Sequence, residues 1–218
     1  MTEDNVLRYK QYMTPPSLSK LIVDNFLKET DIDILEPSCG SGSFLRFLPK
    51  NRKVNAVEID TEFQEDLFAL GKSYPGPAIE KKDKFFVKDN FSLHFENFLE
   101  RDFGDQKFDL VIGNPPYGSY EKGSNALDVD FVKKCIGLLK EDGRIVFLLE
   151  TKFLHGVKRY EEIWKDNAFL LSLNLLARRP RFSDFKGTAT RDCSVFEMCK
   201  KRKYSTSLSE VKWLNLER

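Results

Sequence analysis

The tetrapeptide Asn114-Pro115-Pro116-Tyr117 constrains the fold of this chain more than any other feature. It follows residues 108–112, an apolar run that predicts a buried strand. Two consecutive prolines lack the N–H groups that a sheet ladder needs, so the strand ends here and a rigid turn begins. In open α/β sheets, ligands bind just outside the carboxyl ends of the strands. The turn therefore offers an amide, an unpaired carbonyl and an aromatic ring to a ligand, a set that suits a planar molecule with an exocyclic amine.

The size and composition of the chain predict one soluble globular domain. It has 218 residues, of which 41% are apolar and 32% are charged. No apolar run approaches the ~20 residues needed to cross a bilayer, and the polar, acidic N-terminus carries no secretory signal. The four cysteines are scattered, which favours reduced thiols over a disulfide frame or a zinc site. We therefore expect a cytoplasmic protein with no metal and no membrane partner.

Strand-like and helix-like segments alternate along the chain. This alternation predicts an α/β fold with a mainly parallel sheet and helices on both faces. The connection over residues 178–191 contains no long apolar helix, so we expect a hairpin there and an antiparallel edge strand over 192–199. One domain is predicted over residues 1–203, with an N-terminal motif and helix at 11–28 and a C-terminal tail at 204–218. The other expected strands are 32–36, 53–59, 84–88, 108–112, 143–149 and 170–176, and the other expected helices are 43–48, 61–70, 127–140 and 160–167.

Residues 36–42 form a glycine-containing turn after the first expected strand. Gly40 and Gly42 remove side chains where the backbone must approach a ligand closely. A dinucleotide site would have a third glycine at position 45, where Leu45 stands, and this argues against a bound pyrophosphate. Glu36 would also repel a phosphate. It could instead hold the positively charged amino-acid end of a cofactor.

Acidic residues follow the second and third expected strands. Glu58 comes 18 residues after Gly40, near the offset of an acid that binds ribose hydroxyls. Asp89 follows the third expected strand and could accept a hydrogen bond from an adenine amine. Either acid alone would be an ordinary surface carboxylate, so the prediction depends on their joint placement. The set suits a nucleoside with a charged amino-acid tail and no phosphate, which describes S-adenosylmethionine, with S-adenosylhomocysteine as its product.

The sequence Glu-Pro-Ser-Cys-Gly-Ser-Gly at 36–42, followed by Asn-Pro-Pro-Tyr at 114–117, resembles the adenine-N6 DNA methyltransferases with the gamma order of motifs. The segment 12–16, Tyr-Met-Thr-Pro-Pro, resembles their N-terminal cofactor motif. Over most of residues 11–200, the resemblance implies a Rossmann-like class I methyltransferase with a seven-stranded, mostly parallel sheet and one antiparallel strand. It also implies a role in restriction-modification. The cofactor-binding residues that it implies are Tyr12, Thr14, Glu36, Pro37, Ser38, Cys39, Gly40, Gly42, Phe44, Glu58, Ile59, Asp89, Asn90, Phe91 and Asn114.

The catalytic prediction follows from the chemistry of the adenine amine. Its lone pair is delocalised into the ring, so the amine is a poor nucleophile. Two acceptors on its hydrogens would pull the nitrogen toward a tetrahedral geometry, and the Asn114 side-chain oxygen and the Pro115 carbonyl can serve as these acceptors. The protein then needs only to align nitrogen, methyl and sulfur, without a strong general base. The expected catalytic residues are Asn114, Pro115, Pro116 and Tyr117.

The target base is expected to be flipped out of the duplex and stacked on Tyr117. A second aromatic face is expected from Phe182 or Phe185, although both could instead pack in the core or on the hairpin. Residues 178–203 hold nine Lys or Arg against three Asp or Glu. Such an excess can follow a polyanion, and a solvated basic surface is the alternative. The residues expected to bind DNA are Tyr117, Arg179, Arg181, Phe182, Phe185 and Lys186.

The tetrapeptide alone does not identify the substrate. Protein glutamine-N5 methyltransferases use the same four residues on a planar amide, and some ribosomal RNA adenine-N6 enzymes carry close variants. Those families usually begin the cofactor turn with Asp-Leu-Gly, so the sequence favours DNA. A non-catalytic, cofactor-binding partner subunit is a further alternative. Fifteen residues follow Lys203, too few for a separate target-recognition domain. Target choice would then depend on a separate specificity chain or on the loops at 118–125 and 178–191, or be weak. The alternative is that the chain is a fragment of a longer protein.

Overall fold

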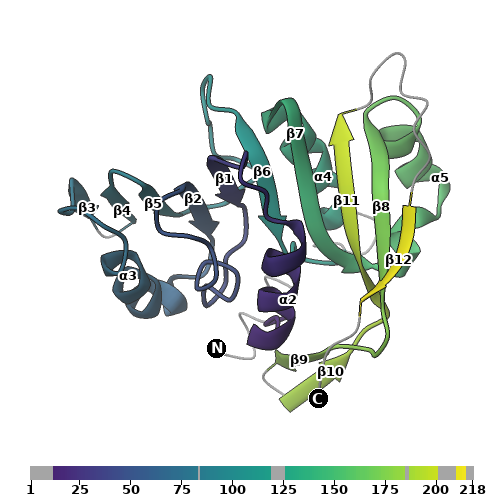
Figure 1. Ribbon diagram of the computed structural model, residues 1–218, viewed down its shortest axis with the longest axis horizontal. Helices are drawn as coiled ribbons and strands as arrows, with labels where there is room; N and C mark the ends of the chain where they lie inside the picture. Colours follow the sequence, from purple (N-terminus) through teal and green to yellow (C-terminus); the bar gives the residue numbers. More distant parts are fainter. Residues whose placement is uncertain (1–11, 83, 119–125, 185–186, 201–209, 215–218) are drawn as a thin grey trace.

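The computed structural model describes residues 12–82, 84–118, 126–184, 187–200 and 210–214. Within these residues a ten-stranded sheet runs through the molecule in the order β12-β8-β11-β7-β6-β1-β2-β5-β4-β3. Helix α2 lies in front of the sheet and α4 behind it (Figure 1). The described part of the chain thus has the predicted α/β architecture.

The elements have the following bounds. The strands of the large sheet are β1 (Asp33–Glu36), β2 (Lys53–Glu58), β3 (Glu80–Lys82), β4 (Phe85–Lys88), β5 (Phe91–Phe95), β6 (Phe108–Gly113), β7 (Leu139–Glu150), β8 (Ala168–Leu176), β11 (Cys193–Lys200) and β12 (Glu210–Leu214). A separate hairpin is formed by β9 (Arg181–Asp184) and β10 (Gly187–Thr190). The helices are α2 (Pro16–Phe26), α3 (Gln64–Lys72), α4 (Leu127–Leu138) and α5 (Val157–Arg159), with single turns η1 (Thr61–Phe63), η2 (Thr151–Leu154) and η3 (Tyr160–Trp164).

Seven central strands form the sheet that the family resemblance implies. In the order β5-β2-β1-β6-β7-β11-β8, only β11 runs antiparallel to its neighbours. The expected hairpin over 178–191 is present as β9 and β10. The expected edge position of the antiparallel strand is wrong, because β11 pairs with β7 on one side and β8 on the other. The segment predicted as a tail supplies β12, which extends the sheet beyond β8.

The third strand of the core was misplaced by the sequence prediction. Residues 84–88 correspond to β4, which runs antiparallel to β5, whereas β5 is the strand that pairs in parallel with β2. Asp89 and Asn90 form the two-residue connection between β4 and β5. A two-residue turn of this kind, with Asp or Asn, is typical of a hairpin. The carboxyl end of β4 therefore lies at the opposite edge of the sheet from the carboxyl ends of β1 and β2.

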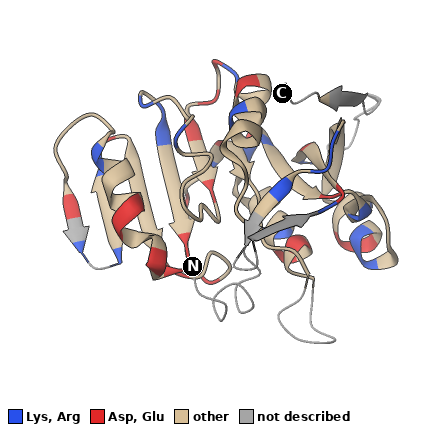
Figure 2. Ribbon diagram, turned by 90° about the horizontal axis from the view of Figure 1, so that it is seen from below, with Lys and Arg blue, Asp and Glu red and all other residues tan. Residues whose placement is uncertain are grey.

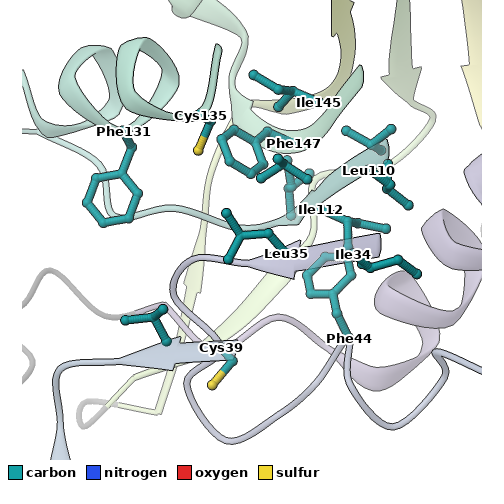
Figure 3. Packing of buried hydrophobic residues seen from close by; sticks show 14 of the residues in the cluster. Ile34, Leu35, Cys39, Phe44, Leu110, Ile112, Phe131, Cys135, Ile145 and Phe147 are labelled. Carbon is teal, nitrogen blue, oxygen red and sulfur yellow. The ribbon is translucent and has the colours of Figure 1, made fainter. Parts of the chain in front are cut away.

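The core explains why the central strands form. In β6, five of six residues are buried, and in β7 residues 145–149 are all buried. Such continuous apolar runs are typical of parallel strands that are covered on both faces. Phe131 and Cys135 of α4 pack toward Leu35 and Phe147 of the sheet (Figure 3). This packing fixes β1 and β6, whose carboxyl ends carry the two motifs.

Residues 43–48, predicted as a helix, form consecutive turns instead. The amide of Gly42 donates to the Cys39 carbonyl at 2.8 Å, and the amide of Arg46 donates to the Gly42 carbonyl at 3.1 Å. Pro49 follows at once, and the residue before a proline is disfavoured in a helical conformation. The segment therefore stays a compact turn that carries Phe44 and Leu45 into the core.

Candidate active site

A cavity opens at the carboxyl ends of β1, β2, β5 and β6. The segment before α2 closes one side, and Phe131 of α4 contributes to the lining. The structure thus brings together residues from both motifs that the sequence singled out. The cavity is lined by Tyr12, Met13, Thr14, Glu36, Pro37, Ser38, Cys39, Gly40, Ser43, Phe44, Glu58, Ile59, Glu96, Asn97, Phe98, Asn114, Pro115, Pro116 and Phe131.

The two glycines of the turn have different roles. Gly40 lines the cavity with φ of +52°, and its amide donates to Glu58 Oε2 at 2.6 Å. Gly42 has φ of +81°, but a Cβ there would lie 2.8 Å from Leu70 Cδ2 and 3.1 Å from Leu67 Cδ2 of α3. The sequence prediction that Gly42 clears space for a ligand is therefore wrong. Its missing side chain lets the turn pack against α3 instead.

Glu36 and Glu58 place two buried carboxylates beside the turn. Glu36 is 1% exposed, and within the described residues its Oε2 atom has no hydrogen-bond partner. Burial and the nearby Glu58 raise the pKa of Glu36 well above its ordinary value. Burial also raises the pKa of Glu58 to about 7, although the amides of Asp60 and Gly40 donate to it and oppose the shift. A cation in the cavity would supply Glu36 with the counter-charge and partner that it lacks.

The Asn114 amide is held in one orientation. Its Nδ2 atom donates to the Tyr12 carbonyl and to Thr14 Oγ1, each at 3.0 Å. A backbone carbonyl only accepts hydrogen bonds, so the amide NH₂ must face Tyr12 and the Oδ1 atom must face the other way. Asn114 and Pro115 also lie beyond the last residue of β6, which keeps the Pro115 carbonyl outside the sheet ladder. Asn114 and Pro115 both line the cavity, and the Asn114 Oδ1 atom is turned toward Tyr117.

Tyr117 lies behind this amide, away from the cavity lining. Its ring is 5% exposed, and its hydroxyl donates to Asn114 Oδ1 and to the Leu148 carbonyl, the latter at 3.1 Å. One hydroxyl proton can serve only one of these acceptors at a time. The ring of Tyr12 stacks on Tyr117 with centroids 6.0 Å apart and planes at 23°. The expectation that Tyr117 presents an open face for a base does not describe this conformation.

Asp89, Asn90 and Phe91 lie away from the site. Asp89 and Asn90 line a separate hollow with Asp33 and Lys53, the first residues of β1 and β2. Phe91 is 1% exposed and belongs to the core. Because β4 runs antiparallel to β5, the residue after β4 cannot reach the cavity. The sequence prediction of these three residues as cofactor ligands is corrected accordingly.

Asn97 lines the cavity after the third strand, and its side chain accepts from the Leu99 amide and donates to Glu100. The true third strand, β5, ends at Phe95, and Glu96, Asn97 and Phe98 follow it into the cavity lining. The amide of Glu96 donates to the Glu58 carbonyl at 2.8 Å, so these residues lie beside the end of β2. The alternation of residues 91–95 after an Asp-Asn pair was the signal that could have identified them.

The remaining lining residues lie on other segments. Met13 adjoins the predicted Tyr12 and Thr14, and a Cβ on Gly40 would lie 3.3 Å from Met13 Sδ. Ser43 belongs to the glycine turn, and Phe131 comes from the face of α4 toward the sheet. No local motif marks Phe131. Its place depends on how α4 packs.

The residues predicted to contact DNA divide into three groups. Phe182 is fully buried, and its ring contacts Tyr12 edge-on at 6.1 Å. Arg179 and Arg181 are exposed, and Arg179 Nε lies 2.5 Å from Asp192 Oδ1. Phe185 and Lys186 lie outside the described residues. Of the predicted alternatives for Phe182, packing inside the protein is therefore the one that the structure supports.

The described basic residues of the segment 178–203 do not share one surface. Strand β11 spans the sheet, so Lys200, whose Nζ donates to the Leu139 carbonyl at 2.7 Å, lies at the far end from Arg191. Basic and acidic positions are interspersed over the described ribbon (Figure 2). In the described ranges there is no group of three or more His, Cys, Asp or Glu that could hold a metal ion. Among the same residues, no helix has the length and apolar character of a membrane span.

Comparison with known proteins identifies relatives. Residues 42–178 match the family model described as Eco57I restriction-modification methylase. The chain is 28% identical over 214 residues to modification methylase CviBIII of Paramecium bursaria Chlorella virus NC1A, covering 89% of this chain and 51% of that protein. It is 46% identical over 69 residues to an uncharacterized adenine-specific methylase of Mycoplasma pneumoniae, covering 29% and 16%. The chain therefore spans about half the length of CviBIII and less of the second relative.

The fold is shared with solved structures. A proposed class I S-adenosylmethionine-dependent methyltransferase from Listeria monocytogenes superposes with a TM-score of 0.65 at 18% identity, covering 94% of this chain and 65% of that one. At this identity the match concerns the fold alone. The predicted class I methyltransferase fold is confirmed.

Proposed function

The chain belongs to the Eco57I restriction-modification methylase family, and on this premise we propose that it transfers a methyl group from S-adenosylmethionine to the N6 amine of adenine in DNA. One observation carries the proposal. The Asn114 amide is locked by Tyr12 and Thr14 so that its Oδ1 atom is an acceptor, and it shares a cavity with the cofactor-type turn at 36–40. A site for the amine that accepts the methyl group and a site for the methyl donor would therefore share one cavity.

The chain's own residues would act on the amine as acceptors. The Tyr117 proton can turn from Asn114 Oδ1 to the Leu148 carbonyl, which frees the amide oxygen for an incoming amine. The Pro115 carbonyl is the second acceptor for that amine. Together these two oxygens would hold the nitrogen so that its lone pair points at the donor. No side chain is required to remove the proton before transfer.

The cavity fits the cofactor at its charged end. Glu36 is a buried carboxylate whose Oε2 atom has no hydrogen-bond partner in the described part of the chain, as expected where a positively charged amino group binds. Glu58 accepts from Gly40 at Oε2 and from Ile59 and Asp60 at Oε1, which leaves one lone pair on Oε2 for a ribose hydroxyl. When bound, S-adenosylmethionine supplies a methyl group on a sulfonium that needs no further activation.

Asn97 is proposed as the residue that receives the adenine end of the cofactor. The Asn97 Oδ1 atom already accepts from the Leu99 amide at 3.1 Å, and its Nδ2 atom donates to Glu100, so the adenine would use the remaining lone pair or N–H. Replacing Asn97 by alanine removes both the turn bonds and the proposed cofactor contact, and is expected to weaken cofactor affinity by about 1–3 kcal/mol. Replacing Asp89 by alanine is the control, because Asp89 lies at the far edge of the sheet. Calorimetric titration with S-adenosylhomocysteine measures both variants. The assignment would be wrong if the Asp89 variant lost affinity and the Asn97 variant did not.

The choice of target requires more than this site supplies. The chain spans about half the length of CviBIII. We propose that a partner specificity chain, or the exposed Arg179 and Arg181 near the hairpin, contribute contacts to DNA. Phosphate contacts would make binding strongly salt-dependent.

The function is tested by offering several acceptors to one enzyme preparation. Labelled S-adenosylmethionine is incubated with random-sequence duplex DNA, single-stranded DNA, RNA and a protein with exposed glutamines. We expect the label in DNA as N6-methyladenine, and sequencing of the modified sites then gives any target preference. Label found only in RNA or protein would contradict the proposal. Background transfer to every acceptor would favour the cofactor-binding partner subunit.

A further inference from the structure

The aromatic face of Tyr117 is covered by another ring of the same chain. Tyr12, which lies just before α2, stacks on Tyr117 and also contacts Phe182 of β9 edge-on, with centroids 6.1 Å apart. Tyr12 therefore touches both rings that the sequence analysis assigned to the target base. Tyr117 is only 5% exposed. A base cannot stack on Tyr117 unless the Tyr12 side chain moves.

The Tyr12 side chain is held in this position by Arg191, which lies just before β11. The Arg191 guanidinium carbon lies 4.6 Å from the centroid of the Tyr12 ring, a cation–π contact, and its Nη2 atom donates to the Tyr12 hydroxyl. Arg191 Nη1 in turn lies 3.7 Å from Glu150 Oε1 at the end of β7. These contacts tie the ring to the rim of the sheet.

The backbone of Tyr12 is fixed independently of its ring. Its carbonyl accepts from Asn114 Nδ2 at 3.0 Å, so the peptide is part of the catalytic support. Rotation about the side-chain bonds could remove the ring and leave that hydrogen bond intact. Arg191 is suited to a new partner, because its side chain is 39% exposed and its Nη1 atom is 3.7 Å from Glu150 Oε1, too far for a hydrogen bond. A guanidinium with a spare donor fits a phosphate oxygen.

We infer that Tyr12 occupies the acceptor-base subsite as a placeholder, and that Arg191 latches it there. A nucleobase then replaces the contact between Tyr12 and Tyr117, and its phosphate replaces the contact between Tyr12 and Arg191. The inference rests on the proposed function, because it names the occupant of the same site. The incoming base stacks on Tyr117, and a phosphate of the DNA strand binds the Arg191 guanidinium. Tyr12 and Arg191 are therefore residues that control access to the subsite. The observed affinity for DNA is reduced by the fraction of protein in the closed state.

Fluorine NMR reports the position of Tyr12 directly. The protein is labelled with 3-fluorotyrosine, saturated with S-adenosylhomocysteine and titrated with single-stranded oligonucleotides of mixed sequence. The Tyr12 resonance is assigned by its absence in Tyr12→Phe. We expect it to shift toward the position of a solvent-exposed tyrosine with adenine-containing strands, and much less with strands that lack adenine. A resonance that stays in place while adenine-containing DNA is bound would overturn the inference.

Conservative variants test the latch. Tyr12→Phe keeps the ring but loses the hydroxyl that Arg191 binds, so we expect it to tighten DNA binding by about three- to tenfold, measured by fluorescence anisotropy. Tyr160→Phe makes the same change at a residue that is 56% exposed and should leave binding unchanged. Unchanged or weaker binding by Tyr12→Phe would overturn the latch. If the unaltered protein transfers no methyl group to DNA, the proposed function is refuted. If it transfers methyl groups but Tyr12 does not move, only this inference is refuted.

Discussion

Replacing Asn114 by alanine is expected to lower the rate of methyl transfer by about 10³-fold or more, the scale of losing a positioned polar group in a catalytic site. The variant loses the Oδ1 acceptor, and the Pro115 carbonyl alone cannot hold both amine hydrogens. Cofactor binding should remain nearly intact, because Glu36, Gly40 and Glu58 do not depend on the amide. Single-turnover assays with labelled S-adenosylmethionine, beside calorimetric titration of the cofactor, separate these two effects.

A control variant guards against a general loss of structure. Asn167 is exposed, and its Nδ2 atom donates to the nearby Glu162 carbonyl at 2.8 Å. Asn167→Ala removes the same amide from the surface and should leave the rate unchanged. If Asn114→Ala turned over at the rate of the unaltered protein, the acceptor mechanism would have to be abandoned. A loss of rate with an equal loss of cofactor affinity would place Asn114 in cofactor binding instead.

The sequence predicted the parts of the site that are encoded locally. The apolar runs of β1 and β6 end at Glu36 and Gly113, and in each case a glycine or proline turn follows. Strand ends of this kind meet at one edge of a parallel sheet, so their joint cavity could be foreseen. The error at Asp89 has a local cause too. Its strand is one arm of a hairpin, and reading it as a parallel strand reversed its direction.

Contacts between distant segments could not be predicted in the same way. Tyr12 meets Tyr117, Phe182 and Arg191 only after the N-terminal segment, the turn after β6 and the β9–β10 hairpin have come together. The spacing of residues in the sequence does not show whether an aromatic ring is open to a nucleobase or covered by another side chain. The same holds for Asn114, whose orientation is set by Tyr12 and Thr14, about a hundred residues earlier.

A buried ionic cluster fixes α2, and with it the segment that orients Asn114. Arg144 of β7 donates to Asp31 Oδ2 at 2.6 Å and to Glu197 Oε1 at 3.1 Å. It also donates to the carbonyl of Phe26, the last residue of α2. The side chains of Arg144 and Asp31 are 5% and 4% exposed. Helix α2 begins two residues after Thr14. By holding α2 in place, the cluster also holds the adjoining residues 12–14, which orient Asn114.

Replacing Arg144 by methionine is expected to lower the free energy of unfolding by about 3–5 kcal/mol. The substitution keeps most of the side-chain volume but leaves Asp31 buried without a counter-ion. Glu197 would keep Lys28, whose Nζ atom is 3.5 Å away, and the Ser172 hydroxyl, which donates to Oε2 at 3.0 Å. Urea unfolding followed by circular dichroism measures the change. Adding Asp31→Asn and Glu197→Gln to this variant should recover part of the loss, because it removes the unpaired charges.

Lys140 offers a matched comparison on the same strand. Its Nζ atom also binds two carboxylates, Asp33 at 2.5 Å and Asp109 at 3.0 Å, but its side chain is 38% exposed. Water can solvate the charges that remain after Lys140→Met, so the expected loss is about 1 kcal/mol or less. The contrast isolates burial as the cause, since both variants remove one cation from two acids. If Arg144→Met and Lys140→Met lowered the free energy of unfolding equally, burial would not be the cause. Helix α2 would then be held only by the packing of its apolar face.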